Sequence, residues 1–473
     1  MTTAILKTQR WGLRLRTRGE RWKDGMPAVD VSTTYKSPAA AVDAARKLWL
    51  SATCQLELDE VERLYRWALS TKKSQLPSDY RRENGDNNEE RCDEPLKKRT
   101  KQSLTDDGGG CGLTREQFNQ AGEKYALLLC QSGRCRKAKK GLVSMGFTCR
   151  LAQQVLDYPS DDDYCKSNID DTTTSDIREQ NVKKKQLSSP PCCQIIDGFL
   201  SKSEMERLRV VFESPTASYW TDHQYTVEPP SPYFSYVISL DQIRENKYNG
   251  GNNTQFGFIG QLIQRIVSCP LLTDRFPRLQ SNAKFVELWA HNRPHASGHQ
   301  MHFDSDDEGR GGVRNPIIST ILYITEGAGG PSLVTNQKLT DSKVATQGWV
   351  AHPRSQRLVV FDGRYLHGVV PGKGVRDGRR VTLMMAFWDD IRIRDGDGPG
   401  SARPFPTPTI SDTSSWASQL MSPLSDSNNS CSDYESCVET DPIQLDTIYE
   451  TLDGKPWKRG MGMPSYDEVF QGF

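Results

Sequence analysis

The sequence predicts an α+β protein in which a β-barrel or β-sandwich core is supported by helices and preceded by a helical region. From Ala283 onward, short apolar runs alternate with turns rich in Gly, Pro and Asp, which is typical of a unit with many short strands. Earlier segments show helical spacing and N-cap signals instead. Only 36% of the 473 residues are hydrophobic and 26% are charged, so we expect part of the chain to lie outside a packed core.

The composition argues against several classes of protein. With 61 Lys and Arg against 60 Asp and Glu, the net charge of +1 gives no support for nucleic-acid binding, although a local basic patch stays open. No apolar run approaches the roughly 18 residues of a membrane helix, and no secretory apolar core is present near the start. The twelve cysteines form no C-x-x-C pair and read as reduced thiols. We therefore expect an intracellular protein, cytoplasmic or nuclear, with no membrane partner.

Residues 1–36 are predicted to form a basic N-terminal arm. The first acid is Glu20, and Lys7 and four arginines precede it with apolar residues between them. Both organelle transit peptides and disordered basic arms have this composition, so an organelle is the alternative location.

Residues 37–158 are predicted to be a helical region with a disordered insertion at 72–112. Ser37 followed by proline marks a helix start, and the insertion mixes charges of both signs without a hydrophobic period. We expect helices over Ala39–Leu50, Glu60–Leu69, Thr114–Cys130 and Lys137–Tyr158.

Residues 159–191 are predicted to be a linker, and the main folded unit begins at Cys192. Ser201-x-x-Glu204 is a capping box that opens a helix. After Asp390 the chain becomes rich in Gly, Pro and Ser, so residues 391–473 are expected to be a largely disordered tail whose aromatic end could dock. Strands are expected over Phe234–Leu240, Phe285–Ala290, Ile317–Thr325, Leu358–Phe361 and Val381–Trp388, with an amphipathic helix over Phe256–Val267.

The chemistry is concentrated in His302-x-Asp304, within the run GHQMHFD. In an extended strand, residues i and i+2 point to the same face, so this imidazole and carboxylate would converge. A second imidazole follows at His367. Two histidines and one carboxylate form the facial triad of non-haem Fe(II) oxygenases, which leaves coordination positions open. Because H-x-D alone is a weak motif, the assignment depends on what accompanies it.

Arg380-x-Thr382 supplies the third part of the pattern. Both side chains would share one strand face, and a guanidinium binds a carboxylate through two parallel hydrogen bonds. The pair suits the distal carboxylate of a dicarboxylic co-substrate. A slip of one residue would exchange the roles of Arg379 and Arg380.

These motifs resemble the Fe(II)/2-oxoglutarate-dependent dioxygenase superfamily, and most of all its prolyl 4-hydroxylase-like branch. The resemblance covers about residues 192–390 and includes IIDGFLSKSEMERL and LVVFDGRYLHGVVPG. The run ELWAHNRPHASGHQMHFDSDDEGRGG also resembles plant and algal members. The resemblance implies a double-stranded β-helix (jelly-roll) core for residues 192–390.

The resemblance also implies how the site is used. Fe(II) and 2-oxoglutarate would react with O₂ to hydroxylate a substrate and release succinate and CO₂, with ascorbate as a candidate reductant. His299 stands where the family often has Tyr, and Arg380 stands where the collagen-type enzymes use Lys. The implied metal ligands are His302, Asp304 and His367; the implied cofactor-binding residues are Arg380, Thr382, Tyr323 and His299; and no catalytic residue is implied beyond the metal ligands.

The favoured substrate is a protein or peptide side chain, by analogy alone. Two alternatives stay open: a nucleic-acid demethylating oxygenase, and a catalytically silent scaffold that binds 2-oxoglutarate. His291 and His295 lie close to the motif in sequence, but Pro294 and Gly298 break any helix that would group them, so no further metal site is expected. Substrate identity, hydroxylation versus demethylation, and oligomeric state are left open by the sequence.

Overall fold

The computed structural model describes residues 37–51, 55–69, 115–160, 191–248, 256–306, 312–374, 376–395, 400–406, 415–423, 437–457 and 468–472. The expected N-terminal arm, the insertion at 72–112 and nearly all of the linker at 159–191 lie outside these residues. Within the described ranges, no helix combines the length and apolar character needed to cross a membrane.

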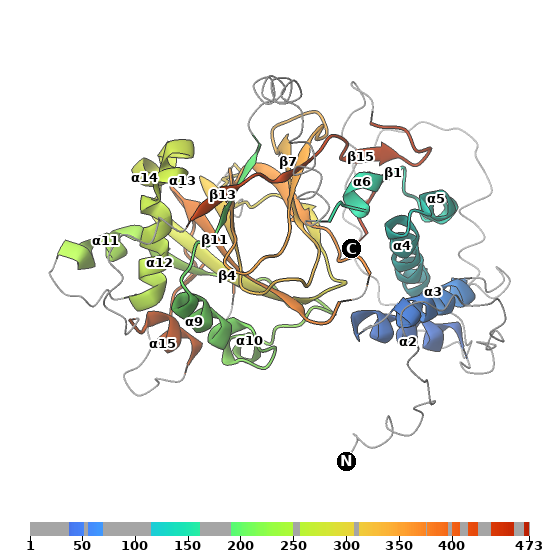
Figure 1. The fold of residues 1–473 in the computed structure, drawn as a ribbon, viewed down its shortest axis with the longest axis horizontal. Helices are drawn as coiled ribbons and strands as arrows, with labels where there is room; N and C mark the ends of the chain where they lie inside the picture. Colours follow the sequence, from blue (N-terminus) through green and yellow to red (C-terminus); the bar gives the residue numbers. More distant parts are fainter. Residues whose placement is uncertain are drawn as a thin grey trace, which may run out of the picture.

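Helices and sheets both build the molecule, as the α+β prediction requires. Figure 1 shows the long strands at the centre, with helices α2–α6 at one side and α9–α15 at the other. Among the described strands, the larger sheet has the order β12-β3-β4-β11-β6-β9-β2-β13. Its strands are β2 (Cys193–Asp197), β3 (Tyr236–Ser239), β4 (Phe285–Pro294), β6 (Ile318–Tyr323), β9 (Leu358–Phe361), β11 (Arg379–Trp388), β12 (Arg403–Pro404) and β13 (Val438–Thr440).

A second sheet has the order β14-β8-β7-β10-β5. Its inner side chains Val334 and Trp349 share a buried cluster with Trp289 and Met384 of the larger sheet, so the two sheets pack face to face. The strands of this sheet are β5 (His299–His302), β7 (Ser332–Lys338), β8 (Gly348–Ala351), β10 (Tyr365–Val369) and β14 (Ile443–Leu445).

Strand β11 shows why its sequence is apolar without alternation. Met384 and Ala386 point to the space between the sheets, whereas Leu383 and Met385 pack against helices on the outer face. A strand covered on both faces reads as a continuous apolar run. The covering helices are α9 (Lys202–Phe212), α10 (Ser218–Asp222), α11 (Leu240–Tyr248), α12 (Gly257–Ser268), α13 (Pro270–Arg275), α14 (Pro277–Asn282) and α15 (Trp416–Met421).

The N-terminal helices share a buried cluster with the smaller sheet, through residues such as Leu333 and Val350. The prediction of one helix over Lys137–Tyr158 is wrong. The helix ends at Ser144, Gly146 has φ +99°, and a short strand follows. This strand, β1 (Cys149–Leu151), pairs with β15 (Tyr449–Thr451) and β16 (Val469–Phe470). The helices are α2 (Pro38–Ser51), α3 (Gln55–Leu69), α4 (Arg115–Gln131), α5 (Cys135–Ser144) and α6 (Gln153–Leu156).

The C-terminal tail also differs from expectation. Instead of being largely disordered, its described parts contribute α15 and strands β12 to β16 to the fold. Trp416 packs under the larger sheet, and Tyr449 and Phe470 pack in the cluster of the N-terminal helices. These apolar side chains are scattered between polar stretches, so the sequence shows no local period that would reveal their burial.

Candidate metal centre and adjoining pocket

His302, Asp304 and His367 come together in space. Their candidate ligand atoms all lie within 4.8 Å of one another, and no other group of three or more His, Cys, Asp or Glu in the described part of the chain has this spacing. The Nε2 atoms of both histidines lie 3.6 Å from Asp304 Oδ1. These separations are too long for good hydrogen bonds, and they suit three ligands around one ion.

The two histidines form a cross-strand pair between β5 and β10. His302 Nδ1 lies 2.8 Å from the Gln300 carbonyl oxygen, and His367 Nδ1 lies 3.0 Å from the Tyr365 carbonyl oxygen. Because a carbonyl only accepts, both Nδ1 atoms donate, so Nε2 is the nitrogen of each ring that could bind a metal.

Asp304 is positioned by hydrogen bonds from two side chains and not by strand pairing. Strand β5 ends at His302, so Asp304 follows the strand instead of continuing it. Ser319 Oγ donates to Asp304 Oδ2 over 2.6 Å, and Asn315 Nδ2 donates to the Asp304 carbonyl oxygen over 2.7 Å. Burial would raise the pKa of Asp304, but His367, His302 and Ser319 together hold it well below its ordinary value. The carboxylate is therefore charged, with Oδ1 left toward the histidines.

The Nε2 atom of the His367 imidazole is buried and has no hydrogen-bond partner among the described residues. Burial lowers the pKa of His367 to about 4, so the ring is neutral near pH 7. A buried nitrogen left unpaired is costly, whereas a neutral imidazole Nε2 is a common metal ligand. The residues present therefore fit a metal ion of the Fe(II) type.

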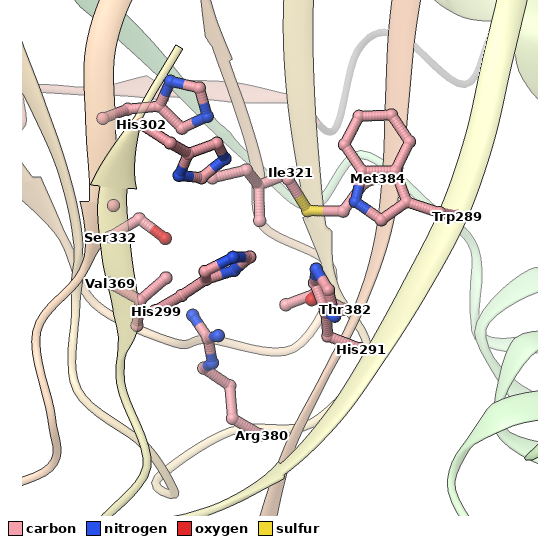
Figure 2. Close-up of a pocket in the computed structure, with 12 residues that line it drawn as sticks. Trp289, His291, His299, His302, Ile321, Ser332, Val369, Arg380, Thr382 and Met384 are labelled. Carbon is pink, nitrogen blue, oxygen red and sulfur yellow. The ribbon is translucent and has the colours of Figure 1, made fainter. Parts of the chain in front are cut away.

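A pocket adjoins this group and extends toward Arg380. It is small and partly open to solvent. In Figure 2 the Arg380 guanidinium lies across His299 from His302, with His291 and Thr382 to one side. The lining residues are Trp289, His291, His299, His302, Ile321, Ser332, His367, Gly368, Val369, Arg380, Thr382 and Met384.

Arg380 is a buried cation without a buried anion. It is 2% exposed, its Nε has no hydrogen-bond partner, and no acid pairs with it in the described ranges. Burial lowers the pKa of Arg380 to about 10, which still leaves the guanidinium charged near pH 7. Since an unpaired buried charge is strongly destabilising, this end of the pocket suits an anionic ligand. Arg379 takes the opposite face, where its Nη2 donates to the Asn292 carbonyl oxygen over 2.7 Å.

Tyr323 lies beside this pocket instead of lining it. It pairs with Thr382 across β6 and β11. Its hydroxyl donates to the Ala351 carbonyl oxygen over 3.0 Å and shares a 2.7 Å hydrogen bond with the Ser332 hydroxyl. Ser332 does line the pocket, so Tyr323 can act on a ligand through it.

His299 lies inside the pocket, next to a histidine that the sequence analysis did not assign to the site. The His299 ring stacks on His302 with centroids 4.7 Å apart and meets His291 edge-on at 5.1 Å. Burial, with the neighbouring positive groups, lowers the pKa of both His299 and His291, so both are neutral. The sequence did contain a signal for His291: it stands two residues after Trp289, so in an extended strand the two side chains share one face. His295 lies apart from the metal centre, accepting from the Gly329 N–H and donating to the Lys373 carbonyl oxygen.

Comparison with known proteins found matches among solved structures only, and these matches are weak. No protein-family model matches the chain, and no curated protein matches its sequence. The chain is similar to a Pseudomonas putida prolyl-4-hydroxylase, with 18% identity, a TM-score of 0.25, and coverage of 42% of this chain and 92% of that one. It is similar to a Trichoplax adhaerens prolyl hydroxylase in complex with a hypoxia inducible factor peptide fragment, with 17% identity, a TM-score of 0.24, and coverage of 46% and 94%. It is also similar to an oxidoreductase of the 2OG-Fe(II) oxygenase family from Burkholderia pseudomallei, with 14% identity, a TM-score of 0.19, and coverage of 31% and 59%.

Proposed function

We propose that this protein is an Fe(II)- and 2-oxoglutarate-dependent dioxygenase that hydroxylates a protein or peptide side chain. One observation carries the proposal: a single pocket is lined at one end by two histidines of the His302, Asp304 and His367 group and at the other by an uncompensated buried guanidinium. A dicarboxylic co-substrate that chelates a metal and ends in a second carboxylate would complete both ends at once.

Each residue has a role in this proposal. His302, Asp304 and His367 hold the iron, which together with 2-oxoglutarate and O₂ supplies the oxidising power when bound. Arg380 binds the distal carboxylate through its guanidinium fork, with the Thr382 hydroxyl as a further donor. The remaining assigned side chains support the co-substrate: Tyr323 acts through Ser332, and the neutral ring of His299 lies between the two ends of the pocket.

We assign residues 192–390 to the catalytic unit and interpret its two facing sheets as a double-stranded β-helix. The placement of the site supports this interpretation, because the metal-type histidines lie on the smaller sheet and Arg380 lies on the larger one. The helical region packs against the smaller sheet, and the tail adds edge strands to both sheets.

Anaerobic binding and aerobic turnover test the proposal together. Adding Fe(II) and 2-oxoglutarate to the full chain should give a visible charge-transfer band, and exposure to O₂ with ascorbate should release succinate. Asp304→Ala should abolish both signals. Asp341→Ala, which changes an exposed turn carboxylate outside the pocket, is the matched control and should leave both intact.

Two outcomes would count against the proposal. A band that persists in Asp304→Ala would refute the ligand assignment. A wild-type band without succinate release, across a peptide library, would favour the silent scaffold.

A further inference from the structure

A second polar cluster lies near the metal centre, formed by the buried Glu287 and Ser235 and the half-exposed Tyr233. Glu287 is 6% exposed. Ser235 Oγ and Tyr233 Oη both donate to Glu287 Oε1, over 2.5 and 3.2 Å. No Lys, Arg or His in the described ranges forms an ion pair with this carboxylate.

Strand register places Glu287 across from Asp304. Glu287 on β4 pairs with Ala386 on β11, and Ala386 pairs with Ser319 on β6. Ser319 in turn holds the Asp304 carboxylate. Two strand spacings amount to about 10 Å, and the small side chain between them leaves room.

This cluster lies away from the co-substrate end of the pocket. Arg380, Thr382, Met384 and Ala386 follow one another along the inner face of β11. Because Glu287 is level with Ala386, it lies three steps along the inner face from Arg380, in the same row as Ser319, which holds Asp304. A group bound there would lie near Asp304 and away from Arg380, the residue proposed to bind 2-oxoglutarate.

Aromatic rings form the walls beside Glu287. Trp289 lines the co-substrate pocket and meets Tyr233 edge-on, with centroids 5.9 Å apart. The Tyr233 side chain is half exposed, so this wall reaches solvent. Carboxylates and aromatic faces together favour ammonium and guanidinium groups over neutral ones.

The energetics of Glu287 agree with a missing cation. Burial raises the pKa of Glu287 to about 7, and the Asp304 carboxylate adds to this effect. Two hydroxyl donors offset only part of the burial cost. A bound cation would supply the compensating charge that the protein itself does not provide.

We propose that Glu287, Tyr233 and Trp289 form the recognition site for a cationic substrate side chain, a lysyl ammonium or an arginyl guanidinium. This inference rests on the proposed function for its meaning, since the cation would hold a carbon of the substrate near the iron. The alternative interpretation is that Glu287 has a structural role only, in which its hydrogen bonds hold the segment of Tyr233 and Ser235 against strand β4.

Ligand-observed NMR titrations of the full-length protein separate these interpretations. The probes are N-acetyl-lysine methylamide and N-acetyl-arginine methylamide, with the norleucine and citrulline analogues as neutral isosteres. The wild type should bind the cationic probes at least about tenfold more tightly. Glu287→Gln keeps one oxygen that can accept from Ser235 and Tyr233 but removes the charge, and should reduce the preference to less than about twofold.

Two further variants protect the test against misfolding. Ser235→Ala removes a structural hydrogen bond but keeps the charge, so it should retain the preference. Tyr233→Leu changes a half-exposed position and should weaken cationic probes about threefold or more without affecting neutral ones.

Equal binding of cationic and neutral probes, no binding of either, or an unchanged preference in Glu287→Gln would overturn the inference. Repeating the titrations with and without Mn(II) and 2-oxoglutarate separates the two proposals. A cation preference in a protein that forms no charge-transfer band with Fe(II) and 2-oxoglutarate would refute the oxygenase and leave the cation site standing.

Discussion

His302 and His367 face each other across β5 and β10, and each donates its Nδ1 hydrogen to the carbonyl oxygen of the residue two positions earlier. The same local device therefore sets the same tautomer in both rings. It leaves both Nε2 atoms 3.6 Å from Asp304 Oδ1, although the three residues are far apart in the chain. The Nδ1 hydrogen bonds lower the cost of organising a metal site, because they already orient both rings toward Asp304.

Removal of His367 should abolish metal-dependent stabilisation. A ligand at 100 times its Kd stabilises the folded state by about 2.7 kcal/mol, so Mn(II) should raise the wild-type Tm measurably. His367→Ala should show no such rise. His352→Ala, which loses a hydrogen bond to the Pro159 carbonyl oxygen outside the pocket, should respond like the wild type. An equal Tm rise in His367→Ala would show that the ion binds elsewhere.

Arg380→Met should separate folding from co-substrate binding. The guanidinium is buried without an anion, so its replacement by an apolar side chain should leave the metal-free protein as stable or more stable. Thermal unfolding with and without 2-oxoglutarate should show stabilisation in the wild type and none in this variant. Arg379→Met, on the opposite strand face, should keep the response to 2-oxoglutarate. Arg380→Lys keeps the charge without the fork, so we expect binding weaker by about tenfold or more.

Two glycines test how the Arg380 side chain is held. Gly329 and Gly327 have φ of +83° and +73°, so alanine is strained at both. A Cβ at Gly329 would lie 2.7 Å from the Arg380 side chain, whereas one at Gly327 would meet only Arg376 Nη1, at 3.7 Å. We expect both variants to lose about 1 kcal/mol or more of stability. Only Gly329→Ala should also raise the Kd for 2-oxoglutarate, measured by titration. A similar Kd in both variants would show that Arg380 is free to shift.

The stability of the protein should depend on pH through Glu287. Its pKa is about 7 in the folded protein against 4.5 for the ordinary group, so the folded state binds a proton more tightly. The resulting stabilisation is complete below about pH 4.5 and is lost as pH rises through 7, a change of roughly 3 kcal/mol. Glu287→Gln lacks this loss. Urea unfolding at pH 5 and pH 8 should therefore show the variant gaining on the wild type at the higher pH; a constant difference would contradict the assignment.

Several elements of the fold followed from local patterns. Strand β9 matches the predicted Leu358–Phe361, and β11 extends the predicted Val381–Trp388 by two residues. The capping box at Ser201 and Glu204 is present, with both of its hydrogen bonds. These features depend on neighbours within a few residues. Strand β1 was missed, because its partners β15 and β16 lie about 300 residues away and its own three residues show no strand pattern.

The candidate site likewise contains residues whose placement the local pattern predicted and residues whose placement it did not. The i, i+2 rule placed Arg380 and Thr382 on one face, and the structure has both in the pocket. The same rule was applied to His302 and Asp304, but Asp304 lies beyond the strand and is placed by Ser319. His291 and Glu287 were not assigned to any site, since their significance depends on what pairs with β4.

The sequence by itself determined the chemical identity of the groups: two imidazoles, a carboxylate and an arginine in strand-like surroundings, with their order along the chain. Tertiary structure alone decided that the two imidazoles pair, that Ser319 turns Asp304 toward them, and that Arg380 is buried without an anion. The physical reason is how far along the chain each interaction reaches. Side-chain alternation is set by the backbone within two residues, whereas burial and the absence of a partner depend on every segment that packs around a group.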